Sequence, residues 1–293
     1  MRGTFKGSLV AIVTPFFDDG KIDFATLERL VEWQIESGTD GIVPCGTTGE
    51  SPTLSHEEHE AVVAAVVTTV RKRIPVLAGA GSNNTIESLR LVRFAEKAGA
   101  DGALVITPYY NKPTPAGLVA HYQAIAAATR LPIVMYNVPG RTGINLLPET
   151  VALLAQTPNI IGIKEASGSL DQVSSILQLC KIDVLSGDDG LTLPIMAVGG
   201  CGVISVVANV APRKMVAMTR AMLKGDLANA ERLHREVYPL CKALFVETNP
   251  IPVKAALAML GKIRDNLRLP LVPLSAAHRV QLAEIMRAVG EGG

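Results

Sequence analysis

The chain has 293 residues, of which 48% are hydrophobic and 19% are charged, and its formal net charge is +1. This composition excludes a disordered chain, and the balance of Lys plus Arg (28) against Asp plus Glu (27) leaves no basic surface for nucleic acid. No apolar stretch is long enough for a membrane span, and Leu9–Val13 is too short for the core of a secretory signal.

Short apolar runs alternate with longer amphipathic segments along most of the chain. Runs that are rich in Val and Ile and apolar throughout are typical of parallel strands buried on both faces. The predicted strands are Ser8–Thr14, Gly41–Cys45, Val76–Gly79, Ala103–Thr107, Ile133–Asn137, Ile160–Glu165, Val184–Gly187 and Val203–Ser205.

The segments between these runs have the periodicity of helices. Ser55 with Glu58 three residues later predicts a capping box at one helix start, and Pro148 and Pro212 suit the first turns of two others. The predicted helices are Phe24–Ser37, Ser55–Val70, Thr85–Ala98, Ala116–Thr129, Pro148–Gln156, Leu170–Leu179, Leu191–Val198 and Pro212–Leu223.

Eight strand–helix units in series predict an α/β fold, a closed (β/α)8 TIM barrel over residues 1–224. A doubly wound open sheet is the alternative, but the GxGxxG turn that would favour it does not follow the first predicted strand. Residues 225–293 show helical patterns only, at Asp226–Leu244, Pro252–Leu260 and Ser275–Val289, and predict a small C-terminal helical domain. Catalytic groups of a TIM barrel lie at the carboxyl ends of its strands.

One predicted strand carries a charged residue in an apolar run, because Lys164 lies within Ile160–Glu165. A buried ammonium is costly, so we expect an uncharged and nucleophilic amine at this position. Such an amine can form an imine with a ketone, which provides an electron sink without a metal or a bound cofactor. A lysine that reaches solvent or pairs with Glu165 is the alternative.

Two other strand ends carry groups that suit carboxylates. The turn Gly46–Gly49 presents N–H groups and the hydroxyls of Thr47 and Thr48 to an anion, although an ordinary glycine-rich turn is equally compatible with these residues. Arg141 follows the fifth predicted strand and can bind a second carboxylate through paired hydrogen bonds, or lie in solvent as a loop residue.

Tyrosines also gather at the strand ends. Three of the five tyrosines in the chain, Tyr109, Tyr110 and Tyr136, lie at the ends of the fourth and fifth predicted strands. Their clustering favours a role for phenol hydroxyls as proton carriers. The four cysteines form no CxxC pair, which is typical of reduced thiols in a cytoplasmic protein and gives no reason to expect a metal site.

These motifs together resemble the 4-hydroxy-tetrahydrodipicolinate synthase (dihydrodipicolinate synthase) family of pyruvate-dependent class I aldolases. The resemblance covers nearly the whole chain. It implies an aldol-type synthase, a carbon–oxygen lyase that joins pyruvate to L-aspartate 4-semialdehyde in the first committed step of the diaminopimelate and lysine pathway. The matching segments are Gly46–Glu50, Tyr136–Pro139, Arg141–Gly143, Gly162–Ala166, Leu185–Asp189 and Asn249–Lys254.

The resemblance implies a role for each catalytic group. Lys164 would hold pyruvate as an imine, and Thr47, Tyr110 and Tyr136 would form a hydroxyl relay for protons. Tyr136 is expected to be the main acid–base group. Tyr110 would reach into the site of a neighbouring subunit, which implies a homotetramer built as a dimer of dimers.

The resemblance also implies the binding residues. Thr47 and Thr48 would hold the carboxylate of pyruvate, and Arg141 would bind the carboxylate of the aldehyde. Gly187 and Ile204 match positions near the lysine, and Ile204 is expected to contribute its main-chain carbonyl.

Family members that are inhibited by L-lysine bind it at the dimer interface. His56 and Glu87 are the usual marks of inhibitable forms, so we expect feedback inhibition, although Pro52 stands where alanine is more usual. The alternative is that these are only polar residues of a loop and a helix start. The matching positions are Ser51, Pro52, Leu54, His56, His59, Gly81, Asn83, Glu87 and Tyr109.

Two other functions are compatible with parts of this pattern. N-acetylneuraminate lyase and ketodeoxy-sugar-acid aldolases keep the lysine and the tyrosine, but Arg141 and Asn249–Lys254 favour the short acidic aldehyde. A barrel retained as a ligand sensor without chemistry is the other alternative, and the presence of every expected catalytic side chain disfavours it.

Overall fold

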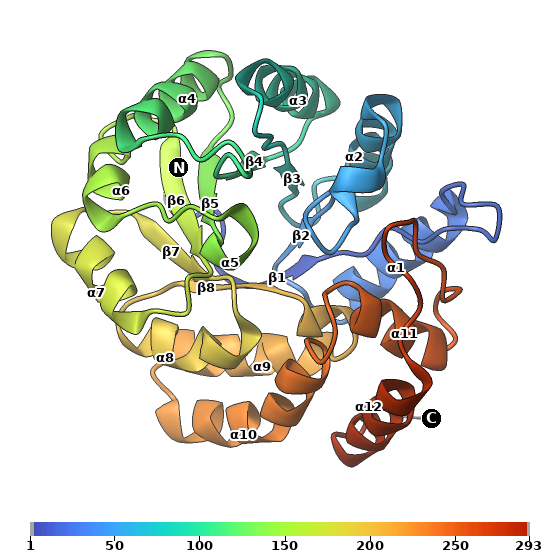
Figure 1. Cartoon of the computed structure of the whole chain (residues 1–293). Helices are drawn as coiled ribbons and strands as arrows, with labels where there is room; N and C mark the ends of the chain where they lie inside the picture. The colour runs from blue at the N-terminus through green and yellow to red at the C-terminus, as the bar shows by residue number, and fades with distance from the viewer. Residues whose placement is uncertain (1–2, 292–293) are drawn as a thin grey trace.

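The computed structural model describes residues 3–291 and contains one ring of parallel strands with helices outside it (Figure 1). The strands are β1 (Gly7–Ala11), β2 (Gly41–Val43), β3 (Leu77–Gly79), β4 (Gly102–Ile106), β5 (Ile133–Asn137), β6 (Ile160–Glu165), β7 (Asp183–Ser186) and β8 (Gly202–Ser205). Their hydrogen-bonded order is β2-β1-β8-β7-β6-β5-β4-β3, and a parallel bridge between Ile42 and Val76 closes the ring. The predicted TIM barrel is therefore confirmed.

The helices around the barrel follow the predicted segments closely. Ser55 and Glu58 form the predicted capping box, since each side chain accepts the backbone N–H of the other. The helices are α1 (Phe24–Glu36), α2 (His56–Val70), α3 (Thr85–Ala98), α4 (Pro115–Ala127), α5 (Pro139–Thr142), α6 (Pro148–Leu154), α7 (Leu170–Leu179), α8 (Thr192–Ala197) and α9 (Pro212–Leu223), with 3-10 turns η1 (Ser51–Thr53), η2 (Asp189–Leu191) and η3 (Val207–Asn209). The four-residue helix α5 and the three 3-10 turns were not predicted.

Three further helices complete the chain: α10 (Leu227–Ala243), α11 (Ile251–Met259) and α12 (Ala276–Ala288). Figure 1 shows α10 beside α9, outside the ring of barrel helices. Buried residues of α10, α11 and α12 belong to the same hydrophobic cluster as the outer face of the barrel. The C-terminal helices thus share a core with the barrel, and their description as a separate domain stays a prediction. No helix within residues 3–291 is long and apolar enough to cross a membrane.

Apolar side chains fill the interior of the barrel at its amino-terminal end, and the carboxyl end opens on a cavity. Phe5 fills the amino-terminal end, where a Cβ on Gly102 would lie 2.6 Å from its ring. Leu104, Leu185 and other apolar residues fill the middle. Tyr136 lies nearer the carboxyl end of β5 and belongs to the same cluster, so the packed interior leads directly to the site described below.

Candidate active site

A cavity of about 460 Å³ lies at the carboxyl ends of the strands, where a TIM barrel carries its catalytic groups. Its wall combines residues that end or follow β2, β5, β6, β7 and β8 with residues of α10 and the loop after it. The lining residues are Thr47, Thr48, Tyr136, Val138, Arg141, Lys164, Ala166, Gly168, Gly187, Asp188, Gly190, Leu191, Val206, Tyr238, Cys241, Lys242, Phe245 and Asn249.

Lys164 lies on the inner face of β6, directly beside Tyr136 of β5 in the strand register. Its amine lies 4.1 Å from the centre of the Tyr136 ring, and the residue is only 6% exposed. Within residues 3–291 no carboxylate comes within ion-pair distance of this amine, and no side chain accepts a hydrogen bond from it. The buried amine therefore faces the cavity with its nitrogen free for chemistry.

The alternative pairing of Lys164 with Glu165 is wrong, because successive side chains of a strand point to opposite faces. The buried Glu165 carboxylate accepts hydrogen bonds from the backbone N–H of Ser167 at 2.7 Å and from the side-chain amides of Asn137 and Gln172, each at 3.1 Å. This network joins the ends of β5 and β6 to α7 and leaves Lys164 unpaired.

Gly187 makes the space that the Lys164 side chain occupies. A Cβ on Gly187 would lie 3.1 Å from Cε of Lys164 and 2.6 Å from Cβ of Ala166. Contacts this short require the neighbours to move, so glycine is required here for close approach rather than for backbone conformation. This explains the predicted place of Gly187 beside the lysine.

The turn after β2 presents two hydroxyls to the cavity. Backbone hydrogen bonds from Gly49 to Gly46 and from Glu50 to Thr47 close this turn. The Thr48 hydroxyl accepts a hydrogen bond from the Asn249 side-chain amide at 3.1 Å, which leaves its own hydrogen free to donate. The Thr48 hydroxyl, together with Thr47, can therefore donate hydrogen bonds to a carboxylate.

Arg141 lies at the rim of the same cavity, on the short helix α5. One of its Nη atoms donates a hydrogen bond to the main-chain carbonyl of Asn249 at 3.1 Å, while the residue remains exposed. This single contact holds the guanidinium at the rim, and its other N–H groups can bind a carboxylate in the cavity.

Two predicted site residues lie outside the cavity lining. The Ile204 side chain packs inside the barrel and is 1% exposed, and Val206, two residues later, lines the cavity; the role expected of the Ile204 main-chain carbonyl stays a prediction. Tyr110 has a backbone φ of 73° and is 89% exposed. The structure therefore does not bring the Tyr110 hydroxyl into the site of its own chain.

A second cavity, of about 210 Å³, adjoins the first, and Thr47 and Tyr136 contribute to both. Burial lowers the pKa of His59 in its wall to about 4, so this imidazole is neutral at pH 7. Eight of the nine positions predicted for the lysine site line this cavity: Ser51, Pro52, Leu54, His56, His59, Gly81, Glu87 and Tyr109. Asn83 does not line it, and its main-chain carbonyl accepts a hydrogen bond from Asn111 instead.

Sequence reasoning missed the contribution of α10 and assigned no contact to Asn249. Tyr238 and Lys242 line the cavity from α10, and Phe245 lines it from the loop after α10. Nothing local in the sequence relates these positions to the strand ends. Asn249 lies in a run that carried the family resemblance, and that was the one available signal for its role.

Comparisons with known proteins agree with this geometry. Residues 4–289 match the model of the dihydrodipicolinate synthetase family. A relative from Thermodesulfovibrio yellowstonii named 4-hydroxy-tetrahydrodipicolinate synthase is 56% identical over 288 residues, which cover 98% of this chain and 99% of the relative.

Solved structures of similar proteins give the same result. A dihydrodipicolinate synthase described as the first monomeric variant is 48% identical, with a TM-score of 0.96 and 98% of each chain covered. A structure from Cyanidioschyzon merolae described as having lysine bound is 41% identical, with a TM-score of 0.95 and coverage of 98% of this chain and 99% of that chain.

Proposed function

Since the chain belongs to the dihydrodipicolinate synthetase family, we propose that it condenses pyruvate with L-aspartate 4-semialdehyde to give 4-hydroxy-tetrahydrodipicolinate. It is thus an aldol-type synthase of the lyase class and serves lysine biosynthesis through diaminopimelate. The observation that carries the proposal is the unpaired amine of Lys164, buried in a cavity that also holds Tyr136, the Thr47–Thr48 turn and Arg141.

The chemistry begins when the Lys164 amine attacks the ketone carbon of pyruvate and water leaves, which forms an imine. Loss of a methyl proton gives an enamine, whose carbon attacks the aldehyde of the second substrate. The amine of that substrate then displaces Lys164 by transimination and closes the six-membered ring. The donors of the Thr47–Thr48 turn hold the pyruvate carboxylate, and Arg141 holds the carboxylate of the aldehyde.

Protons move through hydroxyl groups in this scheme. Tyr136 is the main acid–base group, because its ring lies against the Lys164 amine. Thr47 and the Tyr110 hydroxyl of a second copy complete the relay. The exposure of Tyr110 supports this arrangement, and a solved relative described as the first monomeric variant implies that oligomers are usual among its relatives. The oligomer in this proposal is a homotetramer, a dimer of dimers.

L-Lysine binds in the second cavity and inhibits the enzyme in this proposal. Glu87 offers a carboxylate to an ammonium group, and Ser51, His56 and Tyr109 add polar atoms to the wall. The shared residues Thr47 and Tyr136 give a direct physical connection to the active site. The Cyanidioschyzon merolae relative, described as having lysine bound, supports the ligand.

Two further assignments complete the proposal. Residues 1–224 form the catalytic barrel and residues 225–293 a helical domain that adds Tyr238, Lys242 and Phe245 to the site. The enzyme acts in the cytoplasm, and none of its four cysteines forms a disulfide, which suits that reducing compartment.

Borohydride reduction with pyruvate, followed by peptide mass measurement, tests the function. The wild-type enzyme is expected to carry a reduced pyruvate adduct on Lys164 and to turn over aspartate semialdehyde in a coupled assay. The matched variant Lys164→Gln should show neither. A wild-type enzyme that forms no adduct would refute the proposed chemistry, and an adduct without turnover would refute the second substrate.

A further inference from the structure

The turn that carries Thr47 and Thr48 lies between two non-glycine residues in the left-handed region. Cys45 has a φ of 54° and Glu50 a φ of 55°. Such conformations are unfavourable for residues with a Cβ and persist where surrounding contacts fix them, most often at functional sites. Cys45 is held against β3, since a Cβ on Gly79 would lie 2.2 Å from its carbonyl oxygen. The contacts of Cys45 do not fix Glu50, which ends the turn, so other contacts must fix the conformation of Glu50.

Glu50 supplies that support through a fully buried ion pair with Lys254 of α11. The Lys254 amine lies 2.5 Å from Oε1 of Glu50, and both side chains have no exposed surface. The same amine lies 4.2 Å from the centre of the Phe16 ring. Burial lowers the pKa of Lys254, and the attraction of Glu50 opposes this shift. The pair thus joins the C-terminal helices to the residue that ends the turn.

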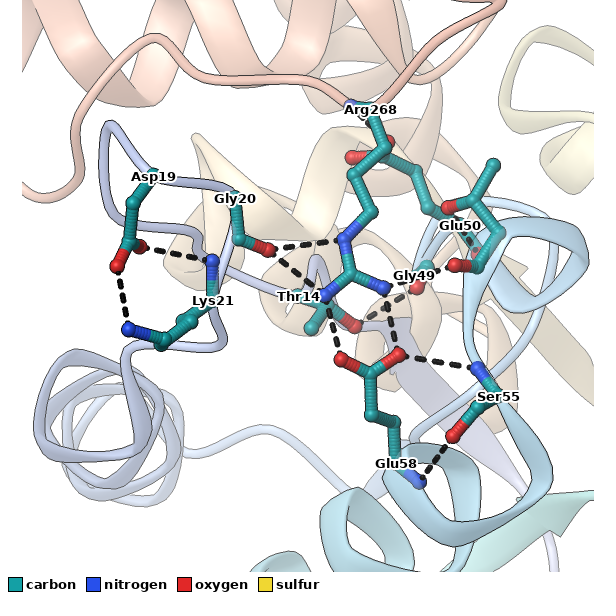
Figure 2. Close-up of polar contacts among 10 residues, drawn as sticks. Thr14, Asp19, Gly20, Lys21, Gly49, Glu50, Ser55, Glu58 and Arg268 are labelled. Carbon is teal, nitrogen blue, oxygen red and sulfur yellow. Dashed lines mark hydrogen bonds and ion pairs between the residues drawn. The ribbon is translucent and has the colours of Figure 1, made fainter.

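A second ion pair, between Arg268 and Glu58, lies beside Glu50 (Figure 2). The backbone N–H of Arg268 donates to Oε2 of Glu50 at 3.1 Å. The Arg268 guanidinium makes two hydrogen bonds of 2.6 Å to the Glu58 carboxylate and also donates to the carbonyls of Gly20 and Thr53. Both carboxylate oxygens of Glu50 are therefore fixed by the C-terminal segment. The contacts of Arg268 also fix the loop between the turn and α2.

We propose that Glu50 and Lys254 are positioning residues that hold the Gly46–Gly49 turn in the shape that binds the carboxylate of pyruvate. The inference rests on the proposed function. A buried ion pair adds little net stability, because the cost of removing two charges from water offsets their attraction. The position of the Glu50–Lys254 pair behind the turn is better explained by its effect on backbone shape, because the pair fixes the Glu50 backbone next to Gly49. Helix α11 thereby supports pyruvate binding through Lys254, which does not line the cavity itself.

The test removes both charges at once and measures pyruvate binding. The double variant Glu50→Leu with Lys254→Met keeps similar side-chain volumes, and such replacements of buried pairs are often tolerated. We expect a folded protein whose half-saturating pyruvate concentration for borohydride trapping on Lys164 rises about tenfold, as for one lost hydrogen bond to a charged group. The KM for aspartate semialdehyde should change less than about twofold, because Arg141 holds that substrate from α5.

The matched control is Arg264→Met, which breaks the exposed ion pair between Arg264 and Asp18. That pair also joins the C-terminal segment to the barrel but does not contact the turn, so pyruvate trapping should match the wild type. If the double variant fails to fold, Glu50→Gln with Lys254→Met decides the question, since it keeps the shape of the Glu50 side chain and leaves no unpaired buried charge. Folded protein with wild-type pyruvate dependence in the deciding variant overturns the inference. A wild-type enzyme that forms no pyruvate adduct would instead refute the proposed function.

Discussion

Replacing Gly187 by alanine tests whether the fit around Lys164 sets the rate of imine formation. The added Cβ would lie 2.6 Å from Cβ of Ala166, 3.1 Å from Cε of Lys164 and 3.2 Å from the Glu165 carbonyl oxygen. Carbon atoms pack favourably at about 3.5 Å or more, so Ala166 must move by about 0.9 Å and Lys164 by about 0.4 Å. Overpacking of this kind costs about 1–3 kcal/mol of stability.

The displacement moves the Lys164 amine itself, so the rate of imine formation should fall by more than the loss of stability alone would cause. A misplacement of about 1 Å costs about 100-fold in rate, and the smaller shift of Lys164 predicts a loss of about tenfold or more. The assay is the rate of pyruvate trapping by borohydride, with thermal unfolding measured in parallel. Gly140→Ala is the control, because a Cβ there meets no atom within 4 Å. Trapping by Gly187→Ala at the wild-type rate would refute the steric reasoning.

Three further substitutions test separate parts of the site. Tyr136→Phe should lower kcat by about 100-fold or more, as for the loss of a general acid–base group, and steady-state turnover measures it. Arg141→Lys should raise the KM for aspartate semialdehyde about tenfold and leave pyruvate trapping unchanged, because an ammonium cannot replace a paired guanidinium contact. His59 has a pKa of about 4 in the folded protein against about 6.5 when unfolded, so the unfolded chain takes up the proton first and stability falls with pH below about 6.5. His59 therefore contributes about 2 kcal/mol to the loss of stability between pH 7 and 5 in urea unfolding, and His59→Phe should lose about 2 kcal/mol less than the wild type, because His121, whose pKa burial also lowers to about 4, keeps its own contribution.

The barrel could be predicted because its signals are local. Ile160–Glu165, Thr85–Ala98 and Leu170–Leu179 have the boundaries that their apolar patterns and caps predict. The first strand was predicted too long, as Ser8–Thr14 instead of Gly7–Ala11. Its last residues are buried but bond to other elements: the Thr14 hydroxyl, for example, donates to the carbonyl of Gly49. Apolar sequence thus indicates burial, whereas the end of a strand depends on where its neighbours stop pairing.

The residues of the candidate site could be predicted from the sequence to about the same extent as the barrel. Lys164, Tyr136 and Arg141 share one cavity because their strands end at the same edge of the barrel, which strand order alone implies. Helix α5 was missed because four residues contain a single turn and no periodicity. The residues of α10 and the following loop were missed because only packing between distant segments brings Lys242 and Phe245 to the strand ends.

Two buried lysines in this chain show why burial alone did not identify the nucleophile. Lys254 is more deeply buried than Lys164, yet its amine is held by Glu50 at 2.5 Å and can reach no ketone. The amine of Lys164 lies 4.1 Å from the centre of the Tyr136 ring and faces the cavity. The ion pair holds the amine of Lys254 at the end of the Gly46–Gly49 turn, whereas within residues 3–291 no carboxylate pairs with Lys164, which suits the imine that we propose for it. In the sequence Lys164 stands next to Glu165, whereas the acidic residue nearest to Lys254 is Glu247, seven positions away, and only the fold shows that Lys254 is the paired lysine.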